Sequence, residues 1–575
     1  MKVFCFVTVL VLALVANASA QPAITSGGVQ NGASYLPGIA PGSIFVIKGS
    51  GLGPATLLQA SSVPFQTSLS NTSVTFAPTS GAPIQALMVY TWDKQLAALL
   101  PSTATPGNYN VTVTYNGATS APEPATVVAR NFGFVTQASS GAGPAQATYG
   151  GYDLNRFTTS TAAFAGHNWS LHPAIIGNKM ILWGTGAGQD SLSDINGGTS
   201  GDQTAAGHFK ITIGGVTVTP AYVGRSSGSP GLDQLNFTVP ANVAPGCFVN
   251  VQVSGDGFTS NLGTIAVVTS GQKACSSSTL TQAQLAHLDN GGTLTIGVLS
   301  LVKNSAESNL LGQAVNLKTE SAGGSFAKYT IDTVGTANFS LDQIGACYIF
   351  NRTGTTQDII QGTPPSRLDA GSKLTLNGPN ASNVAMPMTS AGSDIYGASL
   401  YSSGINGLGA SGAPTLAQGT YTISGTGGAD VGAFTASVNF PGDLTWTNED
   451  TIANPIPRSS PLTINWTGAT SGLVAITGTA FNLSGGTQAN PIYDAAVFTC
   501  IAQATAGTFT VPVSVLSILP AVSGDLTSGS YGSLSLFSAI DPTQGQFSAP
   551  LTAGGKIDQG FFGYSVGSTK TTGWQ

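Results

Sequence analysis

Charged side chains are scarce in this sequence. Lysine and arginine together number 18 and aspartate and glutamate 24, so that 7% of the 575 residues are charged, whereas a soluble domain usually carries about a quarter. The net charge of −6 is spread thinly, and the chain has no basic patch. Nucleic acids and anionic membranes are bound by clustered Lys and Arg. The composition therefore argues against both kinds of partner.

Long apolar runs are also lacking, except at the N-terminus. Lys2 precedes an apolar run from Val3 to Val15, and Ala18-Ser19-Ala20 places small residues before Gln21. This order is typical of a cleaved export signal, and the run is too short to span a bilayer comfortably, which argues against the alternative of an N-terminal anchor. We expect cleavage after Ala20 and export of 575 − 20 = 555 residues with no transmembrane segment. The expected location is extracellular or on the cell surface, with the periplasm as an alternative.

Cysteine is nearly absent. Cys5 lies in the signal, which leaves Cys247, Cys275, Cys347 and Cys500. Their spacings fit no zinc pattern, which would need close pairs. An even number in an exported chain allows disulfides, in three possible connectivities. We predict Cys247–Cys275, because the two flank one domain end, with Cys347–Cys500 as the second candidate and buried free thiols as the alternative.

Glycine and short alternating apolar runs are what the sequence has in quantity. Gly accounts for 75 residues and apolar residues for 41%. Runs of Val, Ile, Phe, Tyr and Leu alternate with Thr, Ser and Asn and end at Gly, Pro or Asn, which is typical of short strands joined by tight turns. The chain is predicted to be all-β, built from tandem immunoglobulin-like β-sandwich domains.

The N-terminal half contains an internal repeat. Residues 42–53 and 177–188 each read as a strand followed by a Gly-[Ser/Thr]-Gly-x-Gly corner, and residues 95–101 correspond to 234–240. The offsets are 184 − 49 = 135 and 234 − 95 = 139. A period this long indicates duplicated domains. A phosphate-binding loop would need a helix N-terminus directly after the glycines, and no helical pattern follows either corner, so we expect the corner glycines to be structural. They are Gly49, Gly51 and Gly53 in the first copy and Gly184, Gly186 and Gly188 in the second.

Several of these motifs carry a family likeness. Asn31–Tyr35, Ile39–Ser43 and Gly49–Gly53, followed by Leu232–Pro240, resemble an uncharacterised domain common in exported acidobacterial proteins. The resemblance implies two immunoglobulin-like sandwiches similar to the IPT/TIG class, exported and without assigned chemistry. The first copy departs from the pattern, with Trp92-Asp93-Lys94-Gln95 where the second has Leu-Asp-Gln, and residues 167–171 form an irregular insert.

The C-terminal half begins near Cys275. Thr281 and Gln284 form a capping-box pattern ahead of one short helix, and strand-like runs follow to the end of the chain. The pattern restarts near Pro441-Gly442, where we place a boundary. The expected organisation is a signal at 1–20, sandwiches at 21–130 and 131–272, a β-rich domain at 273–441 and a sandwich-like domain at 442–575.

Three strings match catalytic or cofactor motifs without the required context. Residues 224–228 and 563–567, centred on Ser226 and Ser565, match the nucleophile-elbow string, but neither precedes a helical pattern. Residues 407–412 match the dinucleotide string outside any βαβ unit. We therefore predict no catalytic residue, no cofactor and no enzymatic activity.

Candidate metal ligands and sugar-stacking residues are few. His167 and His172 are five residues apart, a spacing that does not put both on one helix face, and His208 and His287 are isolated. Asp190, Asp194 and Asn196 lie in one loop, but the glutamate of a calcium loop is missing, so solvated turn residues are favoured. No metal is predicted. Six tryptophans could stack on sugars, of which the three within strand runs are expected in the core: Trp183, Trp446 and Trp466.

These observations predict an exported, non-catalytic structural or adhesive protein whose partner is an unknown surface protein or polysaccharide. A carbohydrate-binding multi-domain protein is the first alternative. The second is a hydrolase whose site the sequence hides, because a glycosidase needs two facing carboxylates and sequence alone cannot pair any.

Overall fold

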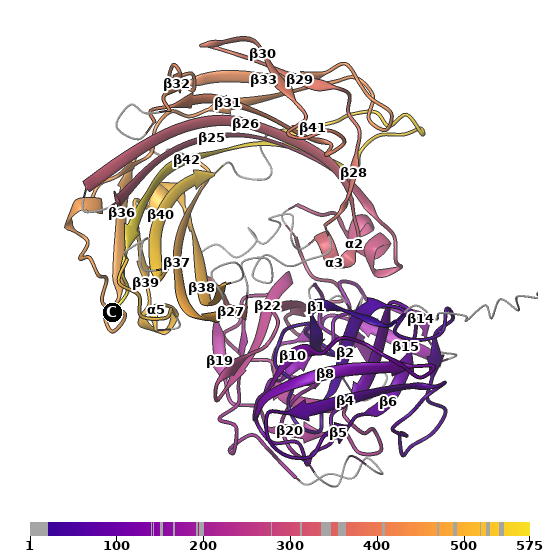
Figure 1. Cartoon of the computed structure of the whole chain (residues 1–575). Helices are drawn as coiled ribbons and strands as arrows, with labels where there is room; N and C mark the ends of the chain where they lie inside the picture. Colours follow the sequence, from indigo (N-terminus) through magenta and orange to yellow (C-terminus); the bar gives the residue numbers. More distant parts are fainter. Residues whose placement is uncertain are drawn as a thin grey trace, which may run out of the picture.

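The chain folds into two sandwiches followed by a long curved sheet with two smaller sheets on its outer side (Figure 1). Strands dominate, and the fold is all-β with tandem immunoglobulin-like sandwiches, as predicted. The computed structural model describes residues 21–137, 139, 141, 143–149, 153–164, 167–190, 194, 201–277, 279–310, 313–334, 347–354, 364–404, 409–468, 471–486, 491–517, 519–524, 529–539 and 545–575. The predicted signal and its cleavage site after Ala20 lie outside these residues.

The first sandwich holds two sheets around one apolar core, which includes Phe45, Phe76 and Val111. Strands such as β8 alternate buried and more exposed residues, so that one face packs inward. One sheet has the order β1 (Ala23–Asn31), β2 (Ile44–Ser50), β7 (Gln95–Leu99), β6 (Leu87–Thr91) and β3 (Leu58–Gln59). The other has the order β10 (Glu123–Val127), β8 (Gly107–Tyr115), β4 (Thr72–Pro78) and β5 (Ile84–Gln85), with β9 (Ala118–Thr119) paired to β8.

The second sandwich repeats this arrangement and adds to it. The path β17 (Lys179–Thr185), β21 (Asp233–Thr238), β20 (Tyr222–Arg225) corresponds to β2, β7, β6, as the repeat implies. The facing sheet has the order β16 (Ala174–Ile175), β24 (Gly263–Val268), β22 (Gly246–Gly255), β18 (Lys210–Ile213) and β19 (Val216–Val218), with β23 (Phe258–Thr259) on β22. The additional strands extend the first sheet and are β11 (Gly133–Phe134), β12 (Ala147–Tyr149), β13 (Asp153–Asn155), β14 (Ser160–Phe164) and β15 (His167–His172). The irregular insert at 167–171 thus lies on strand β15.

The C-terminal half is organised by one 11-stranded sheet, which we call the long sheet. Its main order is β27 (Cys347–Gly354), β38 (Pro491–Gln503), β37 (Leu473–Gly486), β40 (Tyr531–Ala539), β42 (Gln559–Thr572), β25 (Leu294–Leu310), β26 (Gln313–Tyr329), β31 (Ile395–Ser402) and β32 (Ser411–Gly412). Strands β28 (Ser366–Leu368) and β41 (Gln546–Phe547) pair at its sides. Strand β42 runs parallel to β25, which ends 559 − 310 = 249 residues before β42 begins.

Strand pairing in the long sheet crosses the domain boundary expected near Pro441. Strands from both sides of that position alternate within it: β27 pairs with β38, and β25 pairs with β42. What differs across residue 441 is the outer sheet that covers the convex side (Figure 1). A cut at 441 would therefore leave two fragments of one sheet rather than two closed cores.

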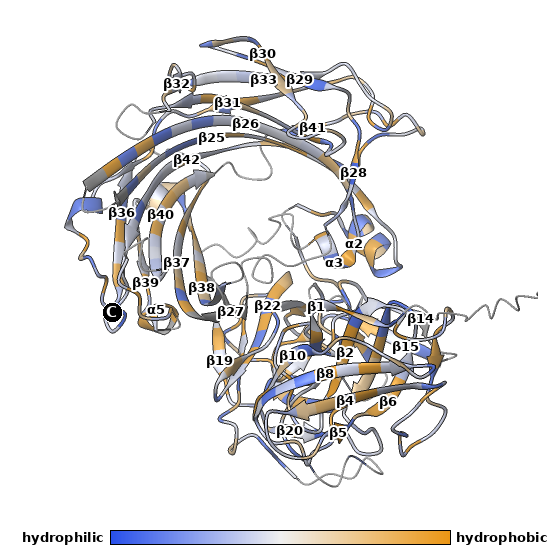
Figure 2. Ribbon diagram, in the orientation of Figure 1, coloured by the Kyte–Doolittle hydropathy of each residue, from blue (hydrophilic) through white to orange (hydrophobic). Residues whose placement is uncertain are grey.

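Each outer sheet buries one stretch of the long sheet. The first packs over β25, β26 and β42 and consists of β30 (Ala381–Pro387), β29 (Lys373–Gly378), β33 (Gly419–Gly425) and β34 (Phe434–Phe440). The second covers β37, β38 and β40 and consists of β35 (Thr445–Trp446), β36 (Leu462–Thr467) and β39 (Thr508–Val511). Strand β39 ends at Val511, and the short helix α5 (Val513–Leu516) follows Pro512. Apolar and polar residues alternate along the strands that supply these cores, and the alternation is visible as coloured bands along β25 and β26 in Figure 2.

A compact junction ties the long sheet to the second sandwich. Helix α2 (Gln282–Asp289) begins at N-cap Thr281 with the predicted capping box to Gln284. With the short helix α3 (Ile331–Val334), it lies between the second sandwich and the ends of β25 and β26 (Figure 1). The apolar residues of the junction come from the second sandwich, from the two helices with the segment before them, and from the long sheet. They are Phe157, Cys247, Phe248, Ala266, Val268, Cys275, Leu280, Leu285, Leu288, Leu294, Ile296, Ala327, Tyr329 and Val334. Strand β27, at the other side of the long sheet, also contacts β23 of the second sandwich.

Candidate binding face and the junctions that hold it

The concave face of the long sheet, which we call the inner face, is uncovered by either outer sheet (Figure 1). On β37, Ile476 and Ala480 belong to the core under the second outer sheet. Because side chains alternate along a strand, Thr477, Thr479 and Phe481 face the opposite way. The register pairs extend this assignment to the neighbouring strands β38, β40 and β42.

Three aromatic rings gather where β37, β38 and β40 meet at one end of the inner face. Phe481 and Tyr531 are directly paired across the strands, with ring centroids 5.3 Å apart and planes 28° apart. Tyr493 meets Phe481 edge-on, at 6.3 Å and 88°. All three are partly exposed, and Leu483, opposite Tyr493, is 44% exposed. We call Phe481, Tyr493 and Tyr531 the aromatic cluster.

Burial within the aromatic cluster shifts the pKa of the Tyr531 phenol. It raises the pKa of Tyr531, and the nearby Tyr493 phenol raises it further. The Tyr531 phenol therefore stays protonated at neutral pH and keeps an O–H that can donate a hydrogen bond.

Paired hydroxyls continue from the aromatic cluster along the inner face. Three cross-strand pairs lie at hydrogen-bond distance: Thr479 with Ser533 at 2.8 Å, Thr477 with Thr499 at 3.1 Å, and Ser535 with Thr569 at 3.0 Å. A hydroxyl has one donor and two acceptor sites. Within each pair, one O–H is used and the other remains for a ligand. We call these six residues the hydroxyl ladder.

The binding face, meaning the aromatic cluster and the hydroxyl ladder together, carries no ionisable group other than its two tyrosines. The neighbouring charged residues on the same strands belong to the other side. Lys570 alternates with Thr569 and donates to the carbonyl of Glu449 at 2.9 Å. Asp494 alternates with Tyr493 and is paired with Asn482 across the strands. The arrangement therefore suits an uncharged partner that offers flat apolar surface and hydroxyl groups.

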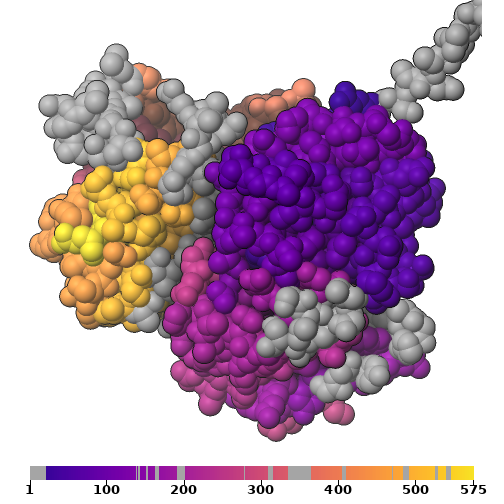
Figure 3. Space-filling view, turned by 60° about the horizontal axis from the view of Figure 1, so that its bottom comes forward, coloured from indigo at the N-terminus to yellow at the C-terminus, as the bar shows by residue number. Residues whose placement is uncertain are grey.

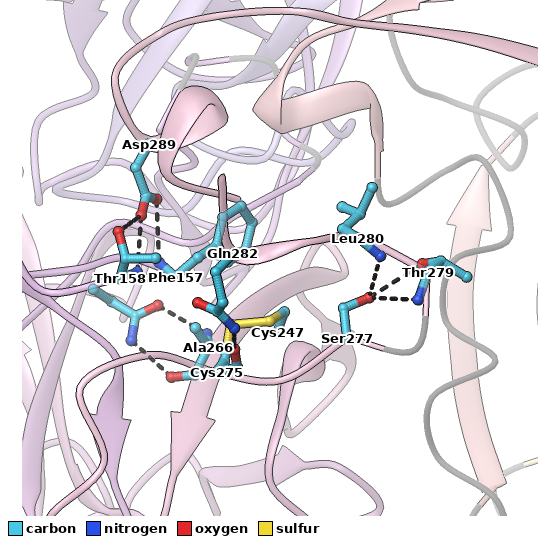
Figure 4. Close-up of a disulfide and its surroundings, with 11 residues drawn as sticks. Phe157, Thr158, Cys247, Ala266, Cys275, Ser277, Thr279, Leu280, Gln282 and Asp289 are labelled. Atoms are coloured by element: carbon cyan, nitrogen blue, oxygen red, sulfur yellow. Dashed lines mark hydrogen bonds between the residues drawn. A yellow bond between two sulfur atoms is a disulfide. The ribbon is translucent and has the colours of Figure 1, made fainter. Parts of the chain in front are cut away.

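The predicted disulfide Cys247–Cys275 forms and lies within the junction (Figure 4). Beside it, the carboxylate of Asp289 at the end of α2 accepts the backbone N–H groups of Phe157 at 3.1 Å and Thr158 at 2.8 Å. Burial raises the pKa of Asp289, opposed by these hydrogen bonds and by the charge of Arg156. The junction thus combines an apolar core, a covalent bond and a buried carboxylate, and it fixes the long sheet against the second sandwich.

The second predicted disulfide, Cys347–Cys500, also forms. The two residues are directly paired between β27 and β38. It fastens the edge strand of the long sheet to its neighbour, across the sequence position where a domain boundary was expected.

The contact between the two sandwiches contains a buried ion pair. Arg225 and Asp233, 2% and 0% exposed, are bonded through Nη1 and Oδ1. The other oxygen of Asp233 accepts the N–H of Ala187 at 2.7 Å. From the first sandwich, Asn31 donates to the carbonyl of Thr185 at 3.3 Å. Figure 3 shows the two sandwiches in direct contact.

The prediction that Asp190 and Asp194 are solvated turn residues is wrong. They are 4% and 9% exposed. The carboxylate of Asp194 accepts both the N–H of Ser102, at 2.6 Å, and its hydroxyl, at 2.8 Å. That hydroxyl is also placed to donate to the carbonyl of Asp190, at 2.8 Å. These two aspartates are buried because they pack onto the first sandwich at Ser102, which no local pattern indicates. Asn196 lies outside the described residues.

The paired glycine corners are held by an aspartate in each copy. In the first, Asp93 Oδ1 accepts the N–H of Gly51 at 2.8 Å and is partly exposed beside Lys94. In the second, Asp233 does the same for the corner after β17, but fully buried. Gly51 has a φ of +66° and Gly186 of +105°, and a Cβ on Gly186 would clash with the carbonyl of Asn131. These conformations support a structural role for the corners.

Neither elbow-like serine occupies a strand-to-helix turn. Ser226 follows β20 in a turn where its N–H donates to the carbonyl of Leu232 at 2.8 Å. Ser565 lies within β42. The string at 407–412 lies partly outside the described residues, and Ser411–Gly412 form strand β32.

The histidines are dispersed. His167 and His172 stand at the two ends of β15. His172 lies 3.3 Å from Asp153, and His208 lies 2.7 Å from Asp256 with its side chain 75% exposed. His287 is exposed on α2. No group of three or more His, Cys, Asp or Glu side chains able to hold a metal occurs among the residues that the structure describes.

Two of the three tryptophans expected in the core are there. Trp446 and Trp466 are 7% and 3% exposed. Trp183 is a correction: it alternates with buried Leu182, remains partly exposed, and donates to Thr148 Oγ1 at 2.9 Å. Of the other three, Trp574 is buried, Trp92 is 37% exposed and Trp169 is partly exposed.

Sequence reasoning missed the binding face because it considered tryptophans alone as sugar-stacking residues. The signal was present in the strand runs themselves. From 473 to 481, the apolar residues needed by the core fall at even positions, and Thr, Thr and Phe fall at 477, 479 and 481. The phase of that alternation identifies the uncovered face, although not which strands are neighbours.

No family model and no curated protein matches the chain. Solved structures match weakly. SGBP-B of the Bacteroides ovatus mixed-linkage glucan utilization locus, in complex with a mixed-linkage heptasaccharide, is 13% identical with a TM-score of 0.19, over 53% of this chain and 68% of that one. A tetra-tandem repeat from the extending region of a large adhesion protein is 12% identical with a TM-score of 0.13, over 96% and 99%. Sidekick-1 immunoglobulin domains 1–4 are 8% identical with a TM-score of 0.11, over 95% and 100%. Likeness at this level carries no argument about what the chain binds.

Among the described residues, no helix has the length and apolarity needed to cross a bilayer.

Proposed function

We propose that this chain is an exported interaction protein of the cell surface or extracellular space, with a structural or adhesive role. The observation that carries the proposal is the way the junctions fix one broad, partly exposed sheet face relative to the sandwich pair. Hydrogen bonds from Ser102 to the buried carboxylate of Asp194 link the two sandwiches. A disulfide, an apolar core and Asp289 link the second sandwich to the long sheet. Such a construction suits a protein that holds a binding surface in place rather than one that closes over a substrate.

Two further observations support export. Both disulfides belong in an oxidising compartment, and the first twenty residues have the order of an export signal. The family resemblance of the N-terminal half, proposed here on its ordered motifs, points to the same location.

Location is tested in a bacterial cell that produces the full chain. N-terminal sequencing of the mature protein is expected to begin at Gln21, and an antibody is expected to label intact cells. A matched variant with Val9→Lys and Leu12→Lys interrupts the apolar run and should be retained inside. Unprocessed protein in the cytoplasm with all five cysteines as free thiols would refute the proposal.

The adhesive role is tested separately with beads coated with the mature chain. The beads are expected to attach to the producing cells or their extracellular matrix more than albumin-coated beads do. Equal attachment of both would remove the adhesive part of the proposal.

A further inference from the structure

We propose that the binding face takes a single chain of an uncharged polysaccharide, with sugar rings on the aromatic cluster and their hydroxyl groups along the hydroxyl ladder. This inference rests on the proposed function and names the class of ligand for it. It concerns the stretch of the inner face formed by β37, β38, β40 and β42, away from helix α2 (Figure 1).

The first step concerns the rings. Aromatic side chains within a folded domain usually lie in its core, yet Phe481, Tyr493 and Tyr531 belong to none of the apolar cores formed by the described residues and are partly exposed on one face. Phe481 and Tyr531 are nearly parallel on adjacent strands. Two such rings offer adjacent apolar surfaces to the C–H faces of successive sugar units. The phenol hydroxyls of the tyrosines add polar groups at the edge of the same surface.

The second step concerns hydrogen bonding. A sugar chain presents many hydroxyl groups, which both donate and accept. The three pairs of the hydroxyl ladder each retain an unused O–H and several lone pairs after bonding to each other. Because each pair is already held across two strands, binding would order few additional side chains, and preorganisation of this kind favours affinity.

The third step concerns charge. The described side chains of the binding face are neutral, so they would not compensate the buried charge of an acidic polysaccharide, a phosphorylated surface polymer or a charged peptide. The nearest carboxylate and ammonium on these strands, Asp494 and Lys570, belong to the other face. Charge therefore favours a neutral glycan over an anionic one.

Binding is measured with the whole mature chain by affinity electrophoresis and by calorimetry. The probes are hydroxyethylcellulose, laminarin and soluble starch, with polygalacturonate as an anionic comparison. At least one neutral polymer is expected to retard and bind the protein, and polygalacturonate is not. If none of the three neutral polymers binds, or if polygalacturonate binds better, the inference is overturned.

Variants then locate the site. Phe481→Ala and Tyr531→Ala should each weaken binding about tenfold, whereas Phe481→Tyr, which keeps a ring of the same shape, should retain most of it. Trp92→Ala is the matched control, because it removes an exposed ring from the first sandwich, far along the chain from the long sheet. Unfolding curves that match the parent's show that a weakened variant is folded. Should Phe481→Ala misfold, Thr477→Val with Thr499→Val replaces one hydroxyl pair with groups of similar shape and should weaken binding instead.

Two results would overturn the site. One is loss of binding in Trp92→Ala while folded Phe481→Ala and Tyr531→Ala bind like the parent. The other is unchanged binding in all of the variants. These outcomes differ from failure of the proposed function: a chain that is exported and adheres to cells, but binds no neutral polysaccharide, keeps the proposed function and loses this inference.

Discussion

Asp233 supports the sharpest stability prediction, because its counterpart in the first sandwich, Asp93, makes a similar hydrogen bond to a glycine corner while partly exposed. Asp233 is fully buried, bonds Arg225 and accepts the N–H of Ala187. The variant Asp233→Asn keeps the shape and one carbonyl oxygen but leaves the charge of Arg225 buried with a neutral partner. Removing one member of a buried ion pair typically costs about 3–5 kcal/mol. Asp194 also lies near enough to attract Arg225, so we expect the lower end, about 3 kcal/mol.

Calorimetry and urea unfolding of the mature chain measure this cost. The transition that contains the second sandwich should move to lower temperature and lower urea in Asp233→Asn. The matched control is Asp93→Asn, which alters the partly exposed aspartate of the first glycine corner beside Lys94. It should leave unfolding nearly unchanged, because ion pairs near the surface contribute little. The double variant Arg225→Met with Asp233→Leu removes both charges and should be less destabilised than Asp233→Asn alone. Equal shifts in the two single variants, or none in Asp233→Asn, would refute the reasoning.

Three more outcomes can be checked. Burial raises the pKa of Asp194, although hydrogen bonds from Ser102 and the charge of Arg225 oppose the rise. The folded state therefore binds the Asp194 proton more tightly than the unfolded state, whose Asp pKa is about 4. The stability that this group contributes is fully present below that pH and is lost as pH rises through the raised pKa of the folded state. Urea titrations of Asp194→Asn should show a flatter dependence on pH, and a profile identical to the parent's would contradict this. Gly51→Val and Gly186→Val, at positions of positive φ, should each lower the melting temperature of their own sandwich only. Parent-like melting of both variants would count against a structural role of the corners, as would nucleotide binding by either corner of the parent chain. Replacing Cys347 and Cys500 with Ala opens a loop of 153 residues, which the chain-entropy model values at about 5 kcal/mol; unchanged urea unfolding, or both thiols alkylated without reduction, would disprove the bond's role.

Local features of the fold were predictable, because local physics determines them. The capping box at Thr281, the repeat of the glycine corners and the alternation in 473–477 depend on neighbouring residues only. Cys247–Cys275 could be predicted because its residues flank one domain end. The all-β class followed from the same short patterns.

The candidate site could not be predicted, because it depends on which distant strands become neighbours. Phe481 and Tyr531 are 50 residues apart in sequence (531 − 481 = 50) and meet only through the pairing of β37 with β40. Asp194 is buried by Ser102 of the other sandwich, 92 residues away. Alternation shows which side of a strand is apolar, but it does not identify the partner strand. The shared long sheet escaped prediction for the same reason.

The place of strand β42 has a consequence for how the chain acquires its structure. β25 and β26 form a hairpin from residues close in sequence, but the other edge of β25 stays open until a strand 249 residues further on has been made (559 − 310 = 249). Parallel pairing over such a separation is slow, because a long loop must close before any contact forms. Meanwhile the free edge of a 17-residue strand is a template for unwanted pairing with other chains. During biogenesis the long sheet should therefore depend on a holding chaperone, and chains that stop before β42 should aggregate while their N-terminal sandwiches fold.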